Sequence, residues 1–159
     1  MVKLIHYWVA ILAAGLLLIS VASAQFPPGG SNSLTGGGRP QPLTIAEAFP
    51  FFVSINDREG LSVSWQIAEN HYLYRHQFEF ALKSTAHSKA QTLAFSLPDG
   101  LKKRDQFFGE IEAYYKTVTA TLKLDTDKLS GSTLVIRFQG CADWGFCYPA
   151  QSVEYSFAP

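Results

Sequence analysis

Apolar and polar residues alternate with a period of two over most of the chain beyond residue 43, and this pattern limits the fold more than any other feature. Such alternation places one face of an extended strand on a core and the other in water, as in antiparallel sheets. The alternation is clear in six segments: 61–67, 78–82, 93–97, 117–124, 134–139 and 152–157. Two further segments, 51–55 and 110–115, show the same alternation weakly.

Turn-forming residues separate these segments, as at Pro98-Asp99-Gly100 and Ser130-Gly131. About six to eight short strands at this spacing predict an all-β fold, an antiparallel β-sandwich of immunoglobulin-like architecture. Helix is expected only as one turn at residues 44–48, which Pro50 follows.

The residues before this region have two distinct compositions. Residues 1–24 read as a cleaved signal peptide, with Lys3, an apolar run over 9–21 and the small residues Ala22-Ser23-Ala24. Residues 25–42 are rich in glycine, proline and serine and predict a flexible leader. We therefore expect an exported domain at residues 43–159, in an oxidising compartment where disulfides persist.

The sequence has two cysteines, Cys141 and Cys147. They lie between segments 134–139 and 152–157, which we expect to pair as antiparallel neighbours. Cysteines that face each other across such a pair fit the disulfide Cα separation of about 4.4–6.8 Å. Pro149 cannot donate a ladder hydrogen bond, so we expect an interruption or a sheet edge there, with accessible sulfurs.

Spacing leaves two interpretations of this pair open. It is a reversible redox centre, or it is the structural staple of a secreted β-sandwich binding module. A staple that closes so short a loop stabilises a fold by only about 2 kcal/mol in the chain-entropy model. No basic residue or histidine lies in 140–151, and Asp143 stands between the cysteines. A carboxylate there is expected to raise the pKa of a nearby thiol.

Several other residue types mark candidate contacts. Asp105 and Gly109 bracket Phe107-Phe108, where we expect one ring to be buried and one not, unless both pack beneath the loop. Trp144 is a candidate partner anchor, a shield for the disulfide, or a cover for the core edge. Arg75 is expected to be a surface charge.

Composition excludes some classes of ligand. The histidines and cysteines show no metal-ligand spacing, so the sequence predicts neither a metal nor a cofactor. Basic and acidic residues balance at 13 each, which gives no indication of a nucleic-acid partner.

The segment Gly140-Cys141-Ala142-Asp143-x-Gly145-Phe146-Cys147-Tyr148-Pro149 resembles the active-site hairpin of a known family, the N-terminal periplasmic domain of the thiol:disulfide interchange protein DsbD. Two other segments match that family in the same order. Trp65-Gln66-Ile67 with Tyr72-Leu73-Tyr74-Arg75 resembles its strand and tyrosine motif, and Asp105-Gln106-Phe107-Phe108-Gly109 resembles its cap loop.

The resemblance implies an immunoglobulin-like domain that passes reducing equivalents to oxidised periplasmic thiol proteins and is re-reduced by a thioredoxin-like domain. Cys147 would form the mixed disulfide with a partner and Cys141 would resolve it. Phe107 would lie over the disulfide until a partner displaces the loop, and Tyr72 and Tyr74 would lie beside the cysteines.

Two positions depart from the family pattern. Gln106 stands where the family's cap loop has an acidic residue, and no carboxylate near Phe52 matches the family's aspartate in the first strand. The sequence ends at Pro159, before any thioredoxin-like part. We therefore expect the reductant to act from another chain or from a missing C-terminal part.

Overall fold

The computed structural model describes residues 40–56, 60–85, 87–124, 127 and 129–159. The predicted signal peptide and residues 25–39 of the predicted leader lie outside them, and the domain boundary at residue 43 stays a prediction. The elements, in chain order, are α2 (Ile45–Ala48), β1 (Phe51–Asn56), β2 (Gly60–Gln66), β3 (His71–Tyr74), the 3-10 helix η1 (Arg75–Gln77), β4 (Glu79–Lys83), β5 (Gln91–Thr92), β6 (Phe95–Ser96), β7 (Leu101–Asp105), β8 (Gly109–Tyr114), β9 (Thr117–Leu122), β10 (Thr133–Phe138), β11 (Gly140–Ala142), β12 (Phe146–Cys147) and β13 (Gln151–Ser156).

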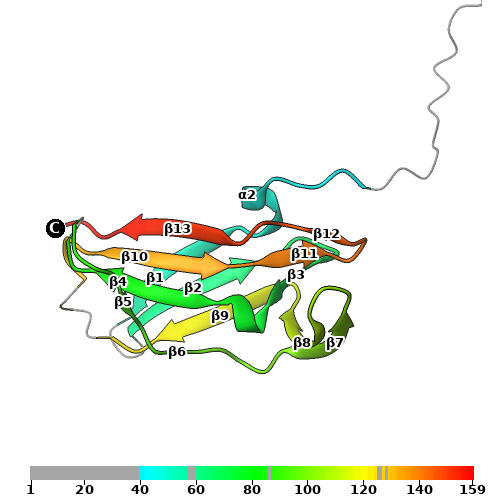
Figure 1. Ribbon diagram of the computed structural model, residues 1–159. Helices are drawn as coiled ribbons and strands as arrows, with labels where there is room; N and C mark the ends of the chain where they lie inside the picture. Colours follow the sequence, from blue (N-terminus) through cyan, green and yellow to red (C-terminus); the bar gives the residue numbers. More distant parts are fainter. Residues whose placement is uncertain (1–39, 57–59, 86, 125–126, 128) are drawn as a thin grey trace, which may run out of the picture. The chain divides into compact units, whose positions relative to one another are not determined.

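These strands form antiparallel sheets, as the alternation predicts. Sheet A has the order β1-β2-β9-β6, sheet C has β13-β10-β4-β5, and sheet B has β12-β11-β3-β8-β7. Figure 1 shows sheets A and C as two layers, with sheet B at one end of them. The predicted fold class, an all-β immunoglobulin-like antiparallel sandwich, is confirmed.

The core lies between the layers and centres on Trp65 of β2. Its indole is buried and meets Phe78, Phe80 and Phe138 edge to face, with ring centres 5.0, 6.2 and 5.6 Å apart. Each large side chain removed from water in this way stabilises the fold by about 1.5–3 kcal/mol. The inward positions of the alternating segments therefore hold the two layers together.

The one predicted helical turn is present as α2. The Thr44 hydroxyl accepts the backbone N–H of Glu47 at 3.3 Å, and the Glu47 carboxylate accepts the backbone N–H of Thr44 at 2.9 Å. This reciprocal capping box begins the helix.

The strand predicted over 93–97 is wrong in extent, because the chain changes sheets there. β5 pairs with β4 of sheet C, whereas β6 pairs with β9 of sheet A. The side chains of Leu93, Phe95 and Leu97 still pack on the core as they cross. The alternation therefore reports burial correctly but not a continuous strand.

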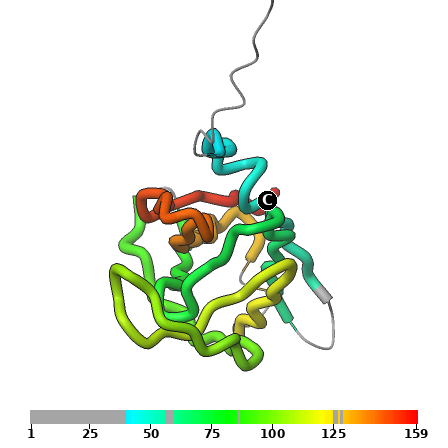
Figure 2. Tube along the Cα trace, turned by 90° about the vertical axis from the view of Figure 1, so that its right-hand side faces the viewer, coloured from blue at the N-terminus to red at the C-terminus, as the bar shows by residue number. Residues whose placement is uncertain are grey.

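Sheet B carries both the cysteine hairpin, β11 and β12, and the hairpin of β7 and β8. Figure 2 looks onto the end of the molecule where these two hairpins lie, in orange and yellow-green. β10 leads straight into β11 through Gln139, so the long strand of sheet C delivers Cys141 to this end.

Candidate active site

The two cysteines form a disulfide between neighbouring strands. Cys141 of β11 lies directly opposite Cys147 of β12, and their Cα atoms are 4.0 Å apart, slightly closer than the predicted range. Direct cross-strand partners outside a hydrogen-bonded pair are the closer kind, at about 4.5 Å, which is near this separation. Pro149 lies in an interruption between β12 and β13, as predicted, and β12 is an edge strand of sheet B. The expected accessibility holds for Cys147, which is half-buried, but is wrong for Cys141, which is 0% exposed.

β11 can pass this close to its neighbours because its first residue is Gly140. A Cβ atom there would lie 2.4 Å from the carbonyl oxygen of Tyr72 and 2.6 Å from Cζ of Phe49. Both distances are shorter than real Cβ contacts. The glycine that precedes Cys141 is therefore needed for packing between β11, β3 and the core.

Two tyrosines of β3 line the buried side of the disulfide. Tyr72 lies opposite Cys141, and Tyr74, two residues on, shares its face. The Tyr74 hydroxyl oxygen is 3.0 Å from Sγ of Cys141 and 3.7 Å from Sγ of Cys147. The two rings meet edge to face at 5.3 Å.

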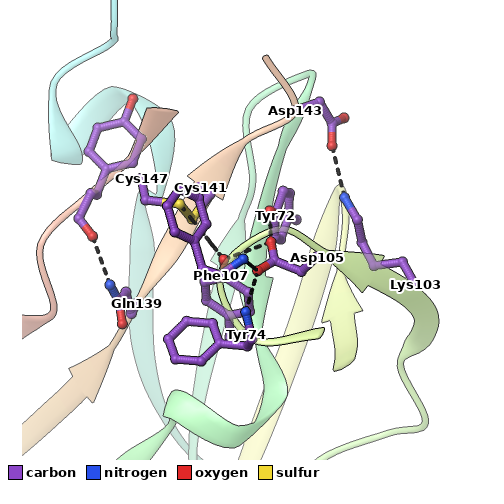
Figure 3. The surroundings of a disulfide bond; sticks show 11 residues. Tyr72, Tyr74, Lys103, Asp105, Phe107, Gln139, Cys141, Asp143 and Cys147 are labelled. Carbon is purple, nitrogen blue, oxygen red and sulfur yellow. Dashed lines mark hydrogen bonds and ion pairs between the residues drawn. A yellow bond between two sulfur atoms is a disulfide. The ribbon is translucent and has the colours of Figure 1, made fainter. Parts of the chain in front are cut away.

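Asp105 connects these tyrosines to the cap loop, residues 105–109. Its Oδ2 accepts the hydroxyls of Tyr72 at 2.6 Å and Tyr74 at 2.9 Å, while Oδ1 accepts the backbone N–H groups of Phe107 at 2.7 Å and Phe108 at 2.9 Å. The residue is 7% exposed. Figure 3 shows the carboxylate between the tyrosines and the loop. One buried side chain thus fixes the loop's backbone to β3.

Burial and hydrogen bonding shift the pKa values of these three groups. Burial alone raises the pKa of Asp105, but the hydrogen bonds from Tyr72, the two loop N–H groups and Tyr74 outweigh it and hold that pKa below its ordinary value. Burial, together with the bond to Asp105, raises the pKa of Tyr72 and raises that of Tyr74 to about 12. At neutral pH the site therefore holds one carboxylate and two protonated phenols.

Phe107 and Phe108 are 55% and 47% exposed, so the expectation that one of them is buried is wrong. The loop is held by its backbone bonds to Asp105, which leaves both rings at the surface. The Phe108 ring contacts Tyr74 and His76 edge to face, with centres 5.0 and 4.9 Å apart. In Figure 3 the Phe107 side chain points from the loop towards the disulfide. Gly109, paired with Asp105, ends the loop.

Asp143 does not stand as a free charge beside the sulfurs. Its Oδ1 accepts a hydrogen bond from Lys103 Nζ at 3.1 Å (Figure 3). It also accepts one from the Tyr115 hydroxyl at 2.7 Å. The sequence expectation considered only residues near the cysteines, whereas Lys103 comes from β7. The predicted rise in thiol pKa from Asp143 is therefore opposed by a cation.

Trp144 lies on the other side of the hairpin, against a histidine. Its ring meets the buried His71 edge to face at 5.0 Å. His71 Nδ1 donates to the carbonyl of Glu69 at 2.8 Å, and its Nε2 is 3.2 Å from the hydroxyl of Tyr148, which follows Cys147. The Trp144 ring is half-buried against His71, and its three candidate roles stay predictions.

Arg75 is more than a surface charge. Its guanidinium donates to Glu112 and to the carbonyl of Pro98, both at 2.9 Å. It thereby ties η1 to β8.

In the described part of the chain, no group of three or more histidine, cysteine or acidic side chains is placed to hold a metal ion. Among those same residues, no helix is long and apolar enough to cross a membrane.

Comparison with known proteins places this arrangement in a family. The model of the family "Thiol:disulfide interchange protein DsbD, N-terminal" matches residues 39–159. The chain belongs to the DsbD N-terminal family. It is 36% identical over 130 residues to DsbD 1 of Pseudomonas aeruginosa, covering 80% of this chain and 21% of that protein. It is 38% identical over 115 residues to DsbD of Salmonella typhi, covering 72% and 19%. The chain thus spans about a fifth of the length of these relatives.

Solved structures agree with the DsbD N-terminal assignment. The reduced N-terminal domain of Neisseria meningitidis DsbD is similar to this chain with a TM-score of 0.61 and 27% identity, over 74% of this chain and 90% of that one. The same species provides a complex between the DsbD N-terminal and PilB N-terminal domains, with a TM-score of 0.56 and 26% identity, over 71% and 84%.

The two departures from the DsbD N-terminal pattern lie in different places. Gln106 reaches from the cap loop to the turn between the cysteines. Its Nε2 atom lies 3.1 Å from the position that a Cβ atom on Gly145 would occupy. Phe52 lies on β1 in sheet A, is exposed, and pairs with Ser64. The acid that the structure places against the tyrosines is Asp105.

Sequence reasoning missed the contacts made by His71, Lys103 and Tyr115. Each lies far along the chain from the cysteines, so only the sheet topology brings it there. The sequence does contain one signal for Lys103: it precedes Asp105 by two residues, and residues so spaced share a face of a strand. Recognising residues 101–105 as a strand would have placed both side chains together.

Proposed function

We propose that this domain is a periplasmic thiol–disulfide exchange protein, which relays reducing equivalents from a thioredoxin-like donor to oxidised periplasmic proteins. The observation that supports it most strongly is the asymmetry of the disulfide. Cys147 is half-buried at a sheet edge, whereas Cys141 is buried beside the Tyr74 hydroxyl. Exchange requires that one sulfur be reached by an attacking thiolate. Cys147 is the sulfur that a partner would reach.

Reduction of the domain then proceeds in two steps. A donor thiolate attacks Sγ of Cys147, the Cys141–Cys147 bond breaks, and Cys141 leaves as a thiolate. The donor's second thiolate attacks the mixed disulfide and releases Cys147, so that two electrons reach this domain and the donor becomes a disulfide. Tyr74 keeps its proton at neutral pH and is placed to donate it in a hydrogen bond to the departing Cys141 sulfur.

Delivery to an oxidised protein uses the same bonds in the opposite direction. The Cys147 thiolate attacks the client's disulfide, which releases one client thiolate and forms a mixed disulfide. Cys141 then attacks Cys147, releases the second client thiolate and restores the starting bond. The net change is one disulfide lost from the client and one regained in this domain, with two protons taken up by the client's thiolates.

The cap loop would control access in both directions. The Phe107 side chain points towards the disulfide from a loop whose backbone is held by Asp105. A partner that reaches Cys147 would move the Phe107 ring aside and would itself cover the disulfide while bound. The solved complex of a relative's N-terminal domain with the PilB N-terminal domain supports a protein partner for this fold.

Export and the electron source complete the proposal. Residues 1–24 would direct the chain to the periplasm and be removed there. The thioredoxin-like reductant would act from another chain or from a further domain of a longer protein.

Trapping a mixed disulfide tests the proposal. In a Cys141→Ala variant, Cys147 can still attack a partner's disulfide, but no second cysteine is left to resolve the mixed disulfide. The variant should therefore accumulate a disulfide-linked adduct with an oxidised thioredoxin-fold protein. The matched Cys147→Ala variant, whose remaining sulfur is buried, should accumulate far less. Trapping through Cys141 alone would reverse the assigned roles, and no adduct with either variant would contradict exchange.

The reduction potential separates this function from the structural staple of a binding module. Exchange proteins lie at about −120 to −270 mV, whereas structural disulfides lie below about −300 mV. Equilibration of the wild-type domain with glutathione and dithiothreitol buffers, followed by alkylation of free thiols, gives the value. A potential in the lower range would favour the staple.

A further inference from the structure

Lys103 links the two hairpins of the site. Its ammonium group donates to Tyr115 at 2.6 Å and to Asp143 at 3.1 Å, and it lies 3.8 Å from the centre of the Tyr72 ring. Tyr115 also donates to Asp143 at 2.7 Å. Asp143 belongs to the turn between Cys141 and Cys147, whereas Lys103 belongs to β7, which leads into the cap loop. We call the contacts of Lys103, Tyr115 and Asp143 the Lys103 bridge.

Backbone pairing leaves the cap end of its hairpin to be positioned by side chains. β8 pairs with β3 through Leu73–Tyr114 and Tyr74–Ala113, both at the end of β8 away from the cap loop. The cap end pairs within its own hairpin, Asp105 with Gly109. β7 is also the edge strand of sheet B. Side-chain contacts of this hairpin therefore decide how closely the cap loop approaches the disulfide. They include those of β7 and the packing of the buried Ile111 of β8 against Tyr72 and Tyr74.

Two side chains of β7 make those contacts on one face. Asp105 bonds to Tyr72 and Tyr74 of β3, and Lys103, two residues earlier, bonds to the cysteine turn itself. The Asp105 bonds order the loop relative to β3. The Lys103 bridge orders β7 relative to the segment that carries the cysteines.

The charge on Lys103 is secure under ordinary conditions. Burial alone lowers the pKa of this ammonium group, but its hydrogen bonds to Tyr115 and Asp143 outweigh burial and raise the pKa above its usual value. The Tyr72 ring adds a cation–π contact. The bridge therefore persists across neutral and mildly alkaline pH.

We propose that Lys103 is a positioning residue, which keeps the cap loop closed over the Cys141–Cys147 disulfide by holding Asp143 in the cysteine turn. The proposal rests on the exchange function proposed above, for which it names the restraint that an arriving partner must overcome. Losing the bridge would let the cap loop open more often. The disulfide would then react faster with small thiols, while its equilibrium with them would stay the same.

The test compares Lys103→Met with Lys102→Met. Lys102 is exposed on the same strand with its side chain on the opposite face, so both variants lose one positive charge from β7. Dithiothreitol, a small dithiol, reduces each oxidised domain, and quenched samples are alkylated and their free thiols are counted by mass. The rate constant should rise about three- to tenfold for Lys103→Met and change by less than about 1.5-fold for Lys102→Met, as expected for losing one weak ion pair and one cation–π contact.

A second comparison excludes a merely structural effect. Asp143→Asn should raise the reduction rate in the same direction as Lys103→Met, and the double variant should be no faster than Lys103→Met, because Lys103→Met already removes every contact of the bridge that involves Lys103. The equilibrium constant with dithiothreitol should stay within about twofold of wild type in each soluble variant. If Lys103→Met does not fold, Asp143→Asn and Tyr115→Phe provide the same measurement. Equal rates for wild type, Lys103→Met and Asp143→Asn would overturn the proposal.

The two proposals fail in different experiments. Reduction by dithiothreitol needs no protein partner, so it reports on the bridge even if Cys141→Ala traps no adduct. If Cys141→Ala traps a partner while Lys103→Met reacts like Lys102→Met, exchange stands and the bridge has no role in closing the cap loop.

Discussion

The hydroxyl oxygen of Tyr74 lies 3.0 Å from the buried sulfur of Cys141. The same hydroxyl also donates to Asp105 at 2.9 Å, so a single proton has two acceptors within reach. In the disulfide form the carboxylate is the stronger acceptor. Reduction would turn Cys141 into a thiolate that competes for that proton, while Asp105 keeps its bonds from Tyr72 and the loop.

Tyr74→Phe should therefore slow reduction of the disulfide. Losing a hydrogen bond to a charged sulfur costs about 1.5 kcal/mol, or roughly tenfold in rate. The variant should also raise the pKa of the Cys141 thiol, measured from thiolate absorbance as the pH of the reduced protein is increased. Tyr155→Phe, at an exposed tyrosine of β13, is the control and should change neither. An unchanged thiol pKa in Tyr74→Phe would show that the hydroxyl does not stabilise the thiolate.

The sequence predicted the longer strands of sheets A and C through the alternation of apolar and polar residues, which is clearest where one face of the strand is buried. β2 shows this alternation from Leu61 to Trp65, and β9 shows it from Val118 to Leu122. The pairing of β10 with β13, and the position of the cysteines beyond β10, followed from the same pattern and are confirmed.

Sheet B was less predictable in this way, and of its strands only β8 corresponds to a segment with alternation, the weak one at 110–115. All four residues of β3 are buried, so no alternation is visible in His71–Tyr74. In β7 the pattern is reversed, because Leu101 is exposed and Asp105 is buried. Asp105 and the tyrosines were identified through the family resemblance. Their hydrogen bonds, and the approach of Lys103 to Asp143, depend on how β7 folds over β3, which local sequence does not encode.

Replacing Gly140 with alanine should destabilise the domain more than any change at the protein surface. The new Cβ would overlap the Tyr72 carbonyl and Phe49, and both belong to well-packed neighbours. We expect a loss of about 2–3 kcal/mol in the free energy of unfolding, measured by urea denaturation. At Gly131→Ala, where a Cβ meets nothing within 4 Å but φ is +69°, the cost should be only about 1–2 kcal/mol. A smaller loss at position 140 than at 131 would contradict this packing.

Phe107 and Phe108 should have separable roles although they are neighbours. Phe107→Ala removes an exposed ring that points towards the disulfide, so reduction by dithiothreitol should accelerate about three- to tenfold with little change in Tm. Phe108→Ala removes ring contacts with Tyr74 and His76 and should cost about 0.5–1.5 kcal/mol of stability. Reduction rates and thermal unfolding of both variants provide the comparison. If only Phe108→Ala is reduced faster, the ring that covers the disulfide is that of Phe108 and not that of Phe107.

Asp105→Ala should loosen the cap loop and destabilise the domain. It removes the acceptor for the two buried hydroxyls of Tyr72 and Tyr74 and for two partly buried backbone N–H groups of the loop. The expected loss is about 2–4 kcal/mol in the free energy of unfolding, accompanied by faster reduction of the disulfide. Asp105→Asn should be milder, because the amide oxygen still accepts the loop N–H groups and its NH2 group donates to the two phenol oxygens.

The pH dependence of the unfolding free energy, compared between wild type and Asp105→Asn, separates the effect of the charge on Asp105 from the effect of its shape. Because folding lowers the pKa of this carboxyl group, its charge contributes stability that is fully present above the ordinary value near 3.9. That contribution is lost as the pH falls from about 4 through the lower pKa of the folded state. The difference in unfolding free energy between wild type and Asp105→Asn should therefore be constant at neutral pH and shrink below pH of about 4. Urea titrations across this range measure it, and a difference that stays constant into acid would show that Asp105 does not hold the loop as a carboxylate.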